Sequence, residues 1–281
     1  MKQFLLNIFR FFILLSIPVL LIISSTRVAS SKIDWMLPKN KHILFMGASH
    51  IVYAVDDSKM SGCINLASLS ERYMYTYIKL QHILMNNNQV DTVFLECAPN
   101  DLSDNADEKY FLDNEMIKFY AIYYPLFHKE QWIMYFKKIG VCSSLLFRET
   151  FINYIEGIDY SYFIDGYIAN RQVLQTTKSI TKNNTKRRFG NQINTYYLRQ
   201  IANLCKSKDI KLYLLFCPHY KPEKYYDLNT FYKSYYHMFN DIELIDYCHF
   251  INNQYDFCDE FHLNQNGANK FTKELKKRFH I

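Results

Sequence analysis

Apolar positions along the chain form two kinds of pattern, which alternate. Continuous apolar runs, typical of strands buried on both faces, cover residues 42–46, 92–97 and 210–217, with a weaker run at 242–245. Apolar and aromatic residues recur at helical spacing over residues 70–85, 196–206, 230–239 and 265–279. Strands that alternate with helices predict an α/β fold with a doubly wound, mostly parallel sheet.

One long stretch interrupts this alternation. Residues 104–191 are rich in Tyr and Phe and are long for a connection between two elements. We expect them to form a lid or substrate-facing insertion within a single α/β domain of residues 42–281, which a linker at residues 28–41 precedes. Aromatic side chains of the insertion would exclude water from a site beneath it, and they include Tyr120, Tyr123, Tyr124, Trp132 and Tyr135.

The N-terminal residues have the character of an export signal. Lys2 and Arg10 precede an uncharged apolar stretch at residues 11–26, and apolar residues before Arg10 lengthen it. We predict an uncleaved transmembrane anchor over residues 1–27, with the N-terminus inside and the α/β domain extracytoplasmic, either periplasmic or at the cell surface. The alternative is a cleavable signal peptide, because the small residues 28–30 form an acceptable cleavage site.

Composition indicates a globular protein. Of the 281 residues, 49% are hydrophobic and 21% are charged, which fits neither a disordered nor a fibrous chain. We see no nucleic-acid-binding module, and the seven cysteines show no close pair. The net charge of +6 is spread along the chain apart from one cluster. We interpret this cluster as a solvated loop, with attraction to an anionic polymer or lipid surface as the alternative; it comprises Lys178, Lys182, Lys186, Arg187 and Arg188.

Polar residues follow the predicted strands at their carboxyl ends. Ser49 follows the first strand, Asn100 the second and His219 the third, while Asp259 and His262 precede the last helix. In open α/β sheets, sites lie beyond the carboxyl ends of the strands. We therefore expect these residues to converge on one site.

The residue types in this set suit acyl transfer. A serine hydroxyl needs a base to take its proton, and a histidine base needs a carboxylate on its other ring nitrogen to fix its tautomer. We assign Ser49 as nucleophile, His262 as base and Asp259 as the residue that orients His262. The backbone N–H of Ser49 and the side-chain amide of Asn100 would stabilise the oxyanion, and His219 would bind substrate.

Four segments, taken together, resemble the sequence blocks of the SGNH (GDSL-like) hydrolase superfamily. In chain order they are Gly47-Ala48-Ser49-His50, Asn65-Leu66-Ala67-Ser68, Ala98-Pro99-Asn100-Asp101 and Asp259-Glu260-Phe261-His262. The resemblance implies a flavodoxin-like three-layer fold and adds the backbone N–H of Ala67 as an oxyanion donor. Ala67 and Ala98 stand where the family has glycine, and the Asp-Ser-Leu core of the first block is absent. Exported, anchored members of the superfamily esterify envelope polymers, as in teichoic-acid D-alanylation and alginate acetylation.

These features predict a serine esterase or O-acyltransferase that forms an acyl-Ser49 intermediate. Its substrate would be ester-linked acyl groups of an envelope or capsular glycan, or another small ester, and its partners would be the membrane and proteins of an envelope assembly system. We expect no cofactor, no metal and no nucleic acid. The alternative, suggested by the two replaced glycines, is a non-catalytic glycan-binding or scaffold component. A metal site of Asp259, His262 and His219 is less favoured because no paired Cys/His spacing accompanies it. We expect His50 to be a packing or hydrogen-bonding neighbour.

Overall fold

The structure, a computed structural model, describes residues 1–30, 34–103, 119, 123–136, 164–175 and 193–281. The chain divides into two compact units. Unit 1 comprises Met1–Asp34 and Phe111–Tyr160, and unit 2 comprises Trp35–Tyr110 and Ser161–Ile281. All of the described strands belong to unit 2.

Unit 2 is built on a five-stranded sheet in which every pair of neighbouring strands is parallel. The strands lie in the order β2-β1-β3-β4-β5. The chain runs from β1 to β2 in one direction and onward to β5 in the other, so its direction reverses between β1 and β3. The strand bounds are β1 (Ile43–Met46), β2 (Cys63–Asn65), β3 (Thr92–Glu96), β4 (Lys211–Phe216) and β5 (Glu243–Asp246).

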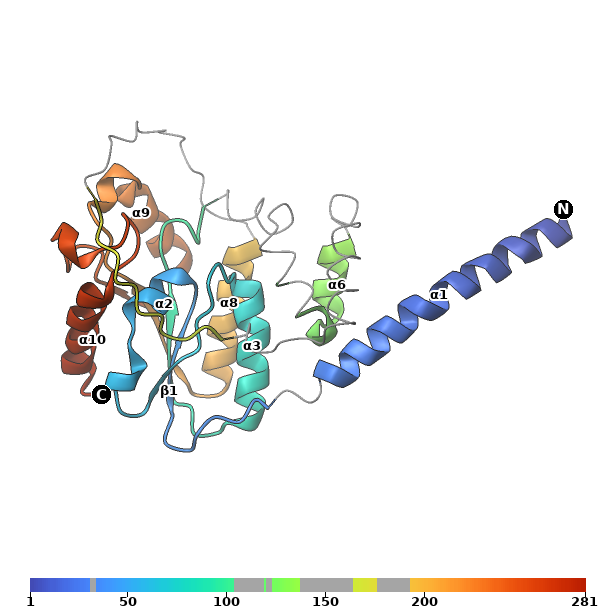
Figure 1. The fold of residues 1–281 in the computed structure, drawn as a ribbon, viewed down its shortest axis with the longest axis horizontal. Helices are drawn as coiled ribbons and strands as arrows, with labels where there is room; N and C mark the ends of the chain where they lie inside the picture. Colours follow the sequence, from blue (N-terminus) through green and yellow to red (C-terminus); the bar gives the residue numbers. More distant parts are fainter. Residues whose placement is uncertain (31–33, 104–118, 120–122, 137–163, 176–192) are drawn as a thin grey trace. The chain divides into compact units, whose positions relative to one another are not determined.

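Helices cover both faces of the sheet. Helices α2 (Ser49–Ala54) and α10 (Gln265–Phe279) lie together on one side, and α3 (Tyr73–Asn86) and α8 (Ile193–Ser207) lie together on the other (Figure 1). Helix α9 (Leu228–Phe239) connects β4 to β5. The predicted α/β fold with a parallel sheet is confirmed, and the arrangement is that of a three-layer α/β protein.

A row of aromatic rings crosses the centre of the sheet. Phe45, Phe94 and Tyr213 occupy paired positions on β1, β3 and β4. Their ring centroids lie 4.7 Å apart between Phe45 and Phe94 and 5.0 Å apart between Phe94 and Tyr213. Burying a side chain of this kind contributes about 1.5–3 kcal/mol. The row therefore fixes the register of the three strands whose carboxyl ends carry Ser49, Asn100 and His219.

The differences from the sequence prediction concern short or irregular segments. Strand β2 and helix α2 have three and six residues, too few to show a period. Residues 164–175, expected in the insertion, belong to unit 2 and run across it as an extended segment. There, the N–H of Ile168 donates to the carbonyl of Val52 at 3.0 Å, and that of Leu174 to the carbonyl of Phe257 at 2.7 Å.

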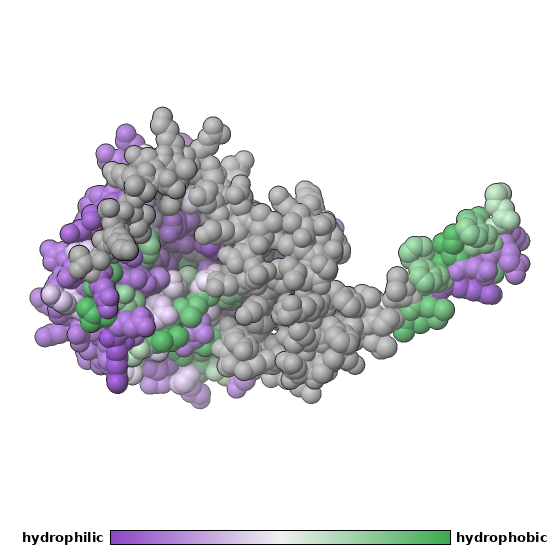
Figure 2. Space-filling model, turned by 45° about the horizontal axis from the view of Figure 1, so that its top comes forward, coloured by the Kyte–Doolittle hydropathy of each residue, from purple (hydrophilic) through white to green (hydrophobic). Residues whose placement is uncertain are grey.

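Unit 1 contains the N-terminal helix α1 (Lys2–Ser30) and the short helices η2 (Tyr124–Leu126) and α6 (Lys129–Phe136). Many apolar side chains of α1 are exposed, including those of Phe9 and Leu14. The space-filling view shows hydrophobic and hydrophilic surface side by side along this helix (Figure 2).

The transmembrane helix predicted over residues 1–27 is not found. Among the helices of the described residues, none combines the length and the apolar character that a membrane crossing requires. Charged and polar side chains, among them those of Lys2, Asn7 and Arg10, interrupt the apolar surface of α1.

Much of the predicted lid lies outside the described residues, which omit 104–118, 120–122 and 137–163. The basic cluster between residues 178 and 188 also lies outside them. Both expectations therefore stay predictions.

Candidate active site

Ser49 lies on a tight connection between β1 and α2. Strand β1 ends at Met46, and Ser49 is the first residue of α2. Between them, Gly47 has a φ of +142°, which a residue with a Cβ rarely adopts. A Cβ at this position would also lie 2.4 Å from the Cβ of Glu96. The turn therefore requires glycine at position 47, and it presents Ser49 at the carboxyl end of the sheet.

The structure brings Ser49, His262 and Asp259 into one hydrogen-bonded chain. Nε2 of His262 is 2.7 Å from Oγ of Ser49, although 213 residues separate the two in sequence. Nδ1 of His262 is 2.9 Å from the nearer carboxylate oxygen of Asp259. Asp259 Oδ1 also accepts the backbone N–H groups of Phe261 and His262, each at 2.8 Å. Asp259 thus fixes both the turn that carries His262 and the imidazole itself.

The charge state of Asp259 determines the tautomer of His262. Burial raises the pKa of Asp259, but the bonds from His262 and from the backbone N–H groups outweigh it and hold the pKa below its ordinary value. Asp259 is therefore ionised at neutral pH and accepts the Nδ1–H of His262. The lone pair of Nε2 then faces the hydroxyl of Ser49, which donates to it.

Two aromatic rings hold the His262 imidazole in place. The ring of Tyr53 meets it edge-on at a centroid distance of 5.2 Å, and the ring of His50 stacks on it at 5.0 Å. The imidazole is thus held by its two nitrogens and by its faces. This arrangement can remove the proton of a serine hydroxyl and return it, which is the chemistry of acyl transfer.

The predicted oxyanion donors differ in whether they already donate a hydrogen bond within the protein. The N–H of Ser49 has no hydrogen-bond partner among the described residues. The N–H of Ala67 donates to Oδ1 of Asn65 at 3.1 Å, so it is already engaged within its own turn. Lys79 reinforces this orientation, because its ammonium bonds the carbonyl of Leu66 at 2.5 Å and so fixes the peptide that carries the N–H of Ala67. The structure therefore differs from the expectation for Ala67.

Asn100 lies in the turn after β3, and its side-chain amide donates to the hydroxyl of Tyr226 at 3.0 Å. The ring of Tyr226 in turn packs edge-on against His219, at a centroid distance of 5.6 Å. Asn100 is thus linked to the rings around the site through Tyr226. Asp101 accepts the N–H of Ala98 at 2.9 Å, which closes the turn as a capping residue would.

His219 is buried beside His50, with 4.5 Å between the ring centroids. Burial lowers its pKa well below the ordinary value, so the imidazole is neutral. Its Nδ1–H donates to the carbonyl of Cys217 at 2.8 Å, and its buried Nε2 has no partner within the part of the chain that the structure describes. Within the described residues, no three His, Cys, Asp or Glu side chains gather as a metal site requires.

Glu96, which the sequence pattern did not single out, lies directly behind Ser49. One of its carboxylate oxygens accepts the N–H of Ala48 at 2.7 Å, and the other is 2.5 Å from Nδ1 of His50. Glu96 is the last residue of β3 and is 2% exposed. The available signal was an acidic residue at the end of an otherwise apolar strand, because carboxylates are rarely buried without a partner.

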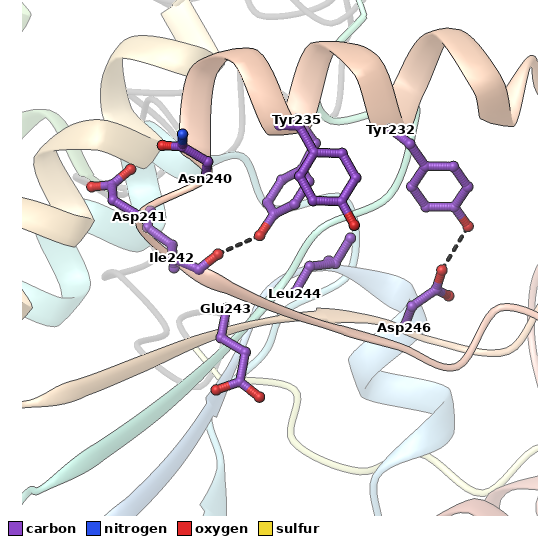
Figure 3. Close-up of a pocket in the computed structure, with 9 residues that line it drawn as sticks. Tyr232, Tyr235, Asn240, Asp241, Ile242, Glu243, Leu244 and Asp246 are labelled. Carbon is purple, nitrogen blue, oxygen red and sulfur yellow. Dashed lines mark hydrogen bonds between the residues drawn. The ribbon is translucent and has the colours of Figure 1, made fainter.

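A pocket of about 500 Å³ lies on another part of unit 2, between α9 and β5 (Figure 3). Tyr232, Tyr235 and Asp246 are among its lining residues, and none of Ser49, Asp259 and His262 is. The hydroxyl of Tyr232 already donates to Asp246 at 2.6 Å, and that of Tyr235 donates to the carbonyl of Ile242. These polar groups are satisfied internally, so the pocket gives no indication of a ligand.

Comparisons with known proteins add little to this geometry. A family model that carries no description matches residues 164–280, which is less than half of the chain. No curated protein matches the sequence. A proposed acylhydrolase from Bacteroides fragilis NCTC 9343 has a similar structure, with a TM-score of 0.43 and 14% identity over 85% of this chain and 86% of that one. A proposed platelet activating factor protein from Streptococcus pneumonia gives a TM-score of 0.41 and 12% identity over 98% of both chains. Similarity at this level carries no argument about activity, which must come from the site itself.

Proposed function

We propose that this chain is a serine-dependent ester hydrolase or O-acyltransferase that works through an acyl-Ser49 intermediate. The observation that carries the proposal is the continuous hydrogen-bonded chain from Ser49 through His262 to Asp259, with atoms 2.7 and 2.9 Å apart. These distances allow a proton to pass between Ser49 and His262. The four segments that resemble the SGNH superfamily support the same assignment.

The first half-reaction forms the acyl-enzyme. His262 Nε2 takes the hydroxyl proton as Ser49 Oγ bonds to the carbonyl carbon of the ester. The negative charge on the former carbonyl oxygen is stabilised by the backbone N–H of Ser49 and by the amide of Asn100. When the intermediate collapses, the bond to the leaving alcohol breaks, and His262 returns its proton to that alcohol. Asp259 stabilises the positive charge that His262 carries between the two transfers.

The second half-reaction decides between hydrolase and transferase. Water or an acceptor hydroxyl gives its proton to His262 and bonds to the acyl carbon. Ser49 then recovers the proton as the free acid or the new ester leaves. We propose that the acyl groups belong to an envelope or capsular glycan. Half-buried rings near the site, those of Tyr53, Tyr225 and Phe261, support this proposal, because aromatic faces suit the apolar faces of sugar rings.

An active-site label tests the chemistry. A fluorophosphonate should phosphonylate Ser49 of the folded protein, and Ser49→Ala should abolish the labelling. Ser58→Ala is the matched control, since Ser58 is an exposed serine bonded to Asp56 and should leave labelling unchanged. Labelling that persists in Ser49→Ala, or that never occurs, would exclude the acyl-Ser49 mechanism.

Acylated glycans then separate hydrolysis from transfer. Release of acid that is unaffected by an added acceptor sugar indicates an esterase. Appearance of the acyl group on the acceptor, with loss of both products in Ser49→Ala, indicates a transferase. A panel that is not turned over at all would reject the glycan ester as substrate.

The second candidate function is a non-catalytic glycan-binding or scaffold component. The observation that favours it is the N–H of Ala67, which is engaged by Asn65 and so is not available as an oxyanion donor. In this case Ser49→Ala should bind acylated glycan as well as the native chain does, as measured by calorimetry, and neither should be labelled.

We also propose that unit 2 acts outside the cytoplasm, because an apolar N-terminal segment with basic residues and no acidic residue precedes it. A reporter enzyme that is active only after export should be active when fused behind residues 1–41. Reporter activity confined to the cytoplasm would contradict this location.

A further inference from the structure

Glu96 holds the residues on both sides of Ser49. Its Oε2 accepts the backbone N–H of Ala48 at 2.7 Å, and its Oε1 is 2.5 Å from the imidazole Nδ1 of His50. Ser49 lies between these two residues in the sequence. One carboxylate therefore fixes the backbone before the serine and the side chain after it.

Glu96 is itself held rigidly. It ends β3, the central strand of the sheet, and its backbone carbonyl accepts the hydroxyl of Tyr73 at 2.7 Å. Gly47 permits the close approach, because any Cβ at position 47 would overlap the Cβ of Glu96. The position of the serine turn is thus set by the sheet and not by the six-residue helix α2 alone.

His50 carries this restraint to the base. Its ring stacks on the ring of His262 with an interplanar angle of 24° and a centroid distance of 5.0 Å. Its other neighbour is the buried His219, at a centroid distance of 4.5 Å. His50 therefore lies between two rings and is anchored at Nδ1, so it limits the rotation of His262 away from Ser49.

We propose that Glu96 and His50 form a positioning pair, which holds the Ser49 turn and the His262 ring in reactive geometry. The inference rests on the proposed function and adds two residues to its site. Neither residue needs to touch substrate, because each acts through Ser49 or His262. Their action differs from that of Asp259, which orients His262 by a bond to its Nδ1, whereas His50 stacks on the face of the ring.

The hydrogen bond between the two residues survives a change of protonation. Burial raises the pKa of Glu96 to about 7 and lowers that of His50 to about 3, so His50 is neutral at physiological pH. The ionised Glu96 accepts the Nδ1–H of His50, while the protonated Glu96 donates to Nδ1. The other titratable or charged groups that act on Glu96 are His262, Arg72, Asp101, Cys97, Cys217 and Tyr73. The hydrogen bond between Glu96 and His50, and with it the placement of the two side chains, therefore does not depend on the charge of Glu96.

The matched variants Glu96→Gln and Glu96→Asp distinguish the effect of side-chain length at position 96 from the effect of its negative charge. Gln keeps the reach, because its amide oxygen accepts from Ala48 and its NH₂ donates to His50. Asp keeps the charge but is one methylene too short to hold both. We expect Glu96→Gln to retain kcat within about 10-fold and Glu96→Asp to lose on the order of 100-fold, with KM nearly unchanged in both. His50→Phe, which retains the stacked ring but loses the anchor, should fall between them. Equal kcat values for folded Gln and Asp variants, or a loss that follows charge, would overturn the proposal.

Amide hydrogen exchange provides a readout that does not depend on activity. The N–H of Ala48 should exchange about 10-fold or more faster in Glu96→Asp than in Glu96→Gln, while exchange in β4 stays unchanged. Exchange that is the same in both variants would overturn the positioning pair. If the two variants show the exchange difference but the native chain shows no Ser49-dependent labelling, the proposed function fails and the positioning pair stands.

Discussion

At the scale of single residues, the candidate site depends on Asp259. The carboxylate bonds three N–H groups within one turn, those of Phe261, the His262 backbone and the His262 ring. The backbone bonds place the imidazole, and the ring bond fixes its tautomer. The two roles can be separated by a substitution that keeps the shape and changes the donor pattern.

Asp259→Asn is that substitution. Its amide oxygen can still accept the backbone N–H groups, but the ring then favours the wrong tautomer, so we expect kcat to fall about 10³- to 10⁴-fold with KM nearly unchanged. Steady-state kinetics on an aryl ester measure both constants. Asp241→Asn, which removes a carboxylate bonded to Arg199 elsewhere, is the control and should keep full activity. A kcat within 10-fold of the native value in Asp259→Asn would contradict the assigned role.

Asp101 gives a prediction for stability and pH. Burial raises its pKa to about 7, with Glu96 acting in the same direction. The folded state therefore binds this proton more tightly than the unfolded state does, so stability falls as pH rises from about 4 to about 7 and is constant above. Asp101→Asn removes this loss. The difference in free energy of unfolding between Asp101→Asn and the native chain, from urea titrations, should grow over this interval and then level off. A difference independent of pH would contradict the raised pKa.

The residue scale also shows what the sequence could predict. That Ser49, His262 and Asp259 lie together could be predicted because their types and order define a known chemistry, and the turn that contains Asp259 and His262 is local. Glu96 and the partner of the Ala67 N–H were not found. The role of Glu96 depends on contacts between the end of β3 and the turn after β1, which the pattern along the chain does not specify. The bond from the N–H of Ala67 to Asn65 is local, but it depends on the backbone conformation of a turn that shows no period.

At the scale of elements, the connections matter more than the regular elements they join. Helix α10 was predicted with its bounds, because its apolar face repeats over four turns and Asn264 caps its first residues. The turn from β1 to α2 and the loop from β2 to α3 show no period. They are set by Gly47 in one case and by a buried ion pair in the other.

Gly47→Ala tests the first connection. The substitution combines a strained φ with overlap against Glu96, so we expect a loss of at least about 1–3 kcal/mol in the free energy of unfolding, together with loss of labelling at Ser49. Gly166→Ala is the matched control, since Gly166 has a φ of +64° but a Cβ there would lie 3.5 Å from the nearest atom. It should lose less stability and keep its labelling. Equal losses in the two variants would remove the argument from close approach.

Lys79 tests the second connection. Its ammonium bonds Glu71 at 2.6 Å, and both side chains are completely buried. Burial lowers the pKa of Lys79 and raises that of Glu71, and each opposes this change in the other. We expect Lys79→Met to destabilise the fold by about 3–5 kcal/mol, because it leaves a buried carboxylate without its partner. The double variant Lys79→Met with Glu71→Leu should recover most of the loss in urea unfolding; a double variant no more stable than the single one would contradict this explanation.

At the scale of the whole molecule, the site lies where the chain reverses direction across the sheet. The reversal falls between β1 and β3, and these strands end in the Ser49 turn and in Glu96. Connections leave in opposite directions there, so a space opens beyond the strand ends. The fold class and this location could be predicted from alternating strands and helices. The assignment of residues 164–175 to unit 2 could not be predicted from the sequence. This segment is held by backbone hydrogen bonds, and its apolar residues do not recur at a regular spacing.

The division into units gives a further prediction. Every hydrogen bond described for the site joins residues of unit 2. A variant that begins at Trp35 should therefore keep Ser49-dependent labelling by a fluorophosphonate, and its thermal unfolding should remain cooperative. Loss of labelling in a folded variant would show that residues 1–34 contribute to the site.

The sequence separation of 213 positions between Ser49 and His262 also has a consequence for biosynthesis. At about 5–20 residues per second, the ribosome adds His262 roughly 10 to 40 s after Ser49. Under the proposed mechanism, the nascent polypeptide carries throughout that interval a Ser49 whose base is missing, so its hydroxyl is not activated toward esters. Truncated translation products that end before Asp259 would be equally inert. Under the proposed mechanism, reactivity therefore arises only once the polypeptide is long enough to bring His262 to Ser49.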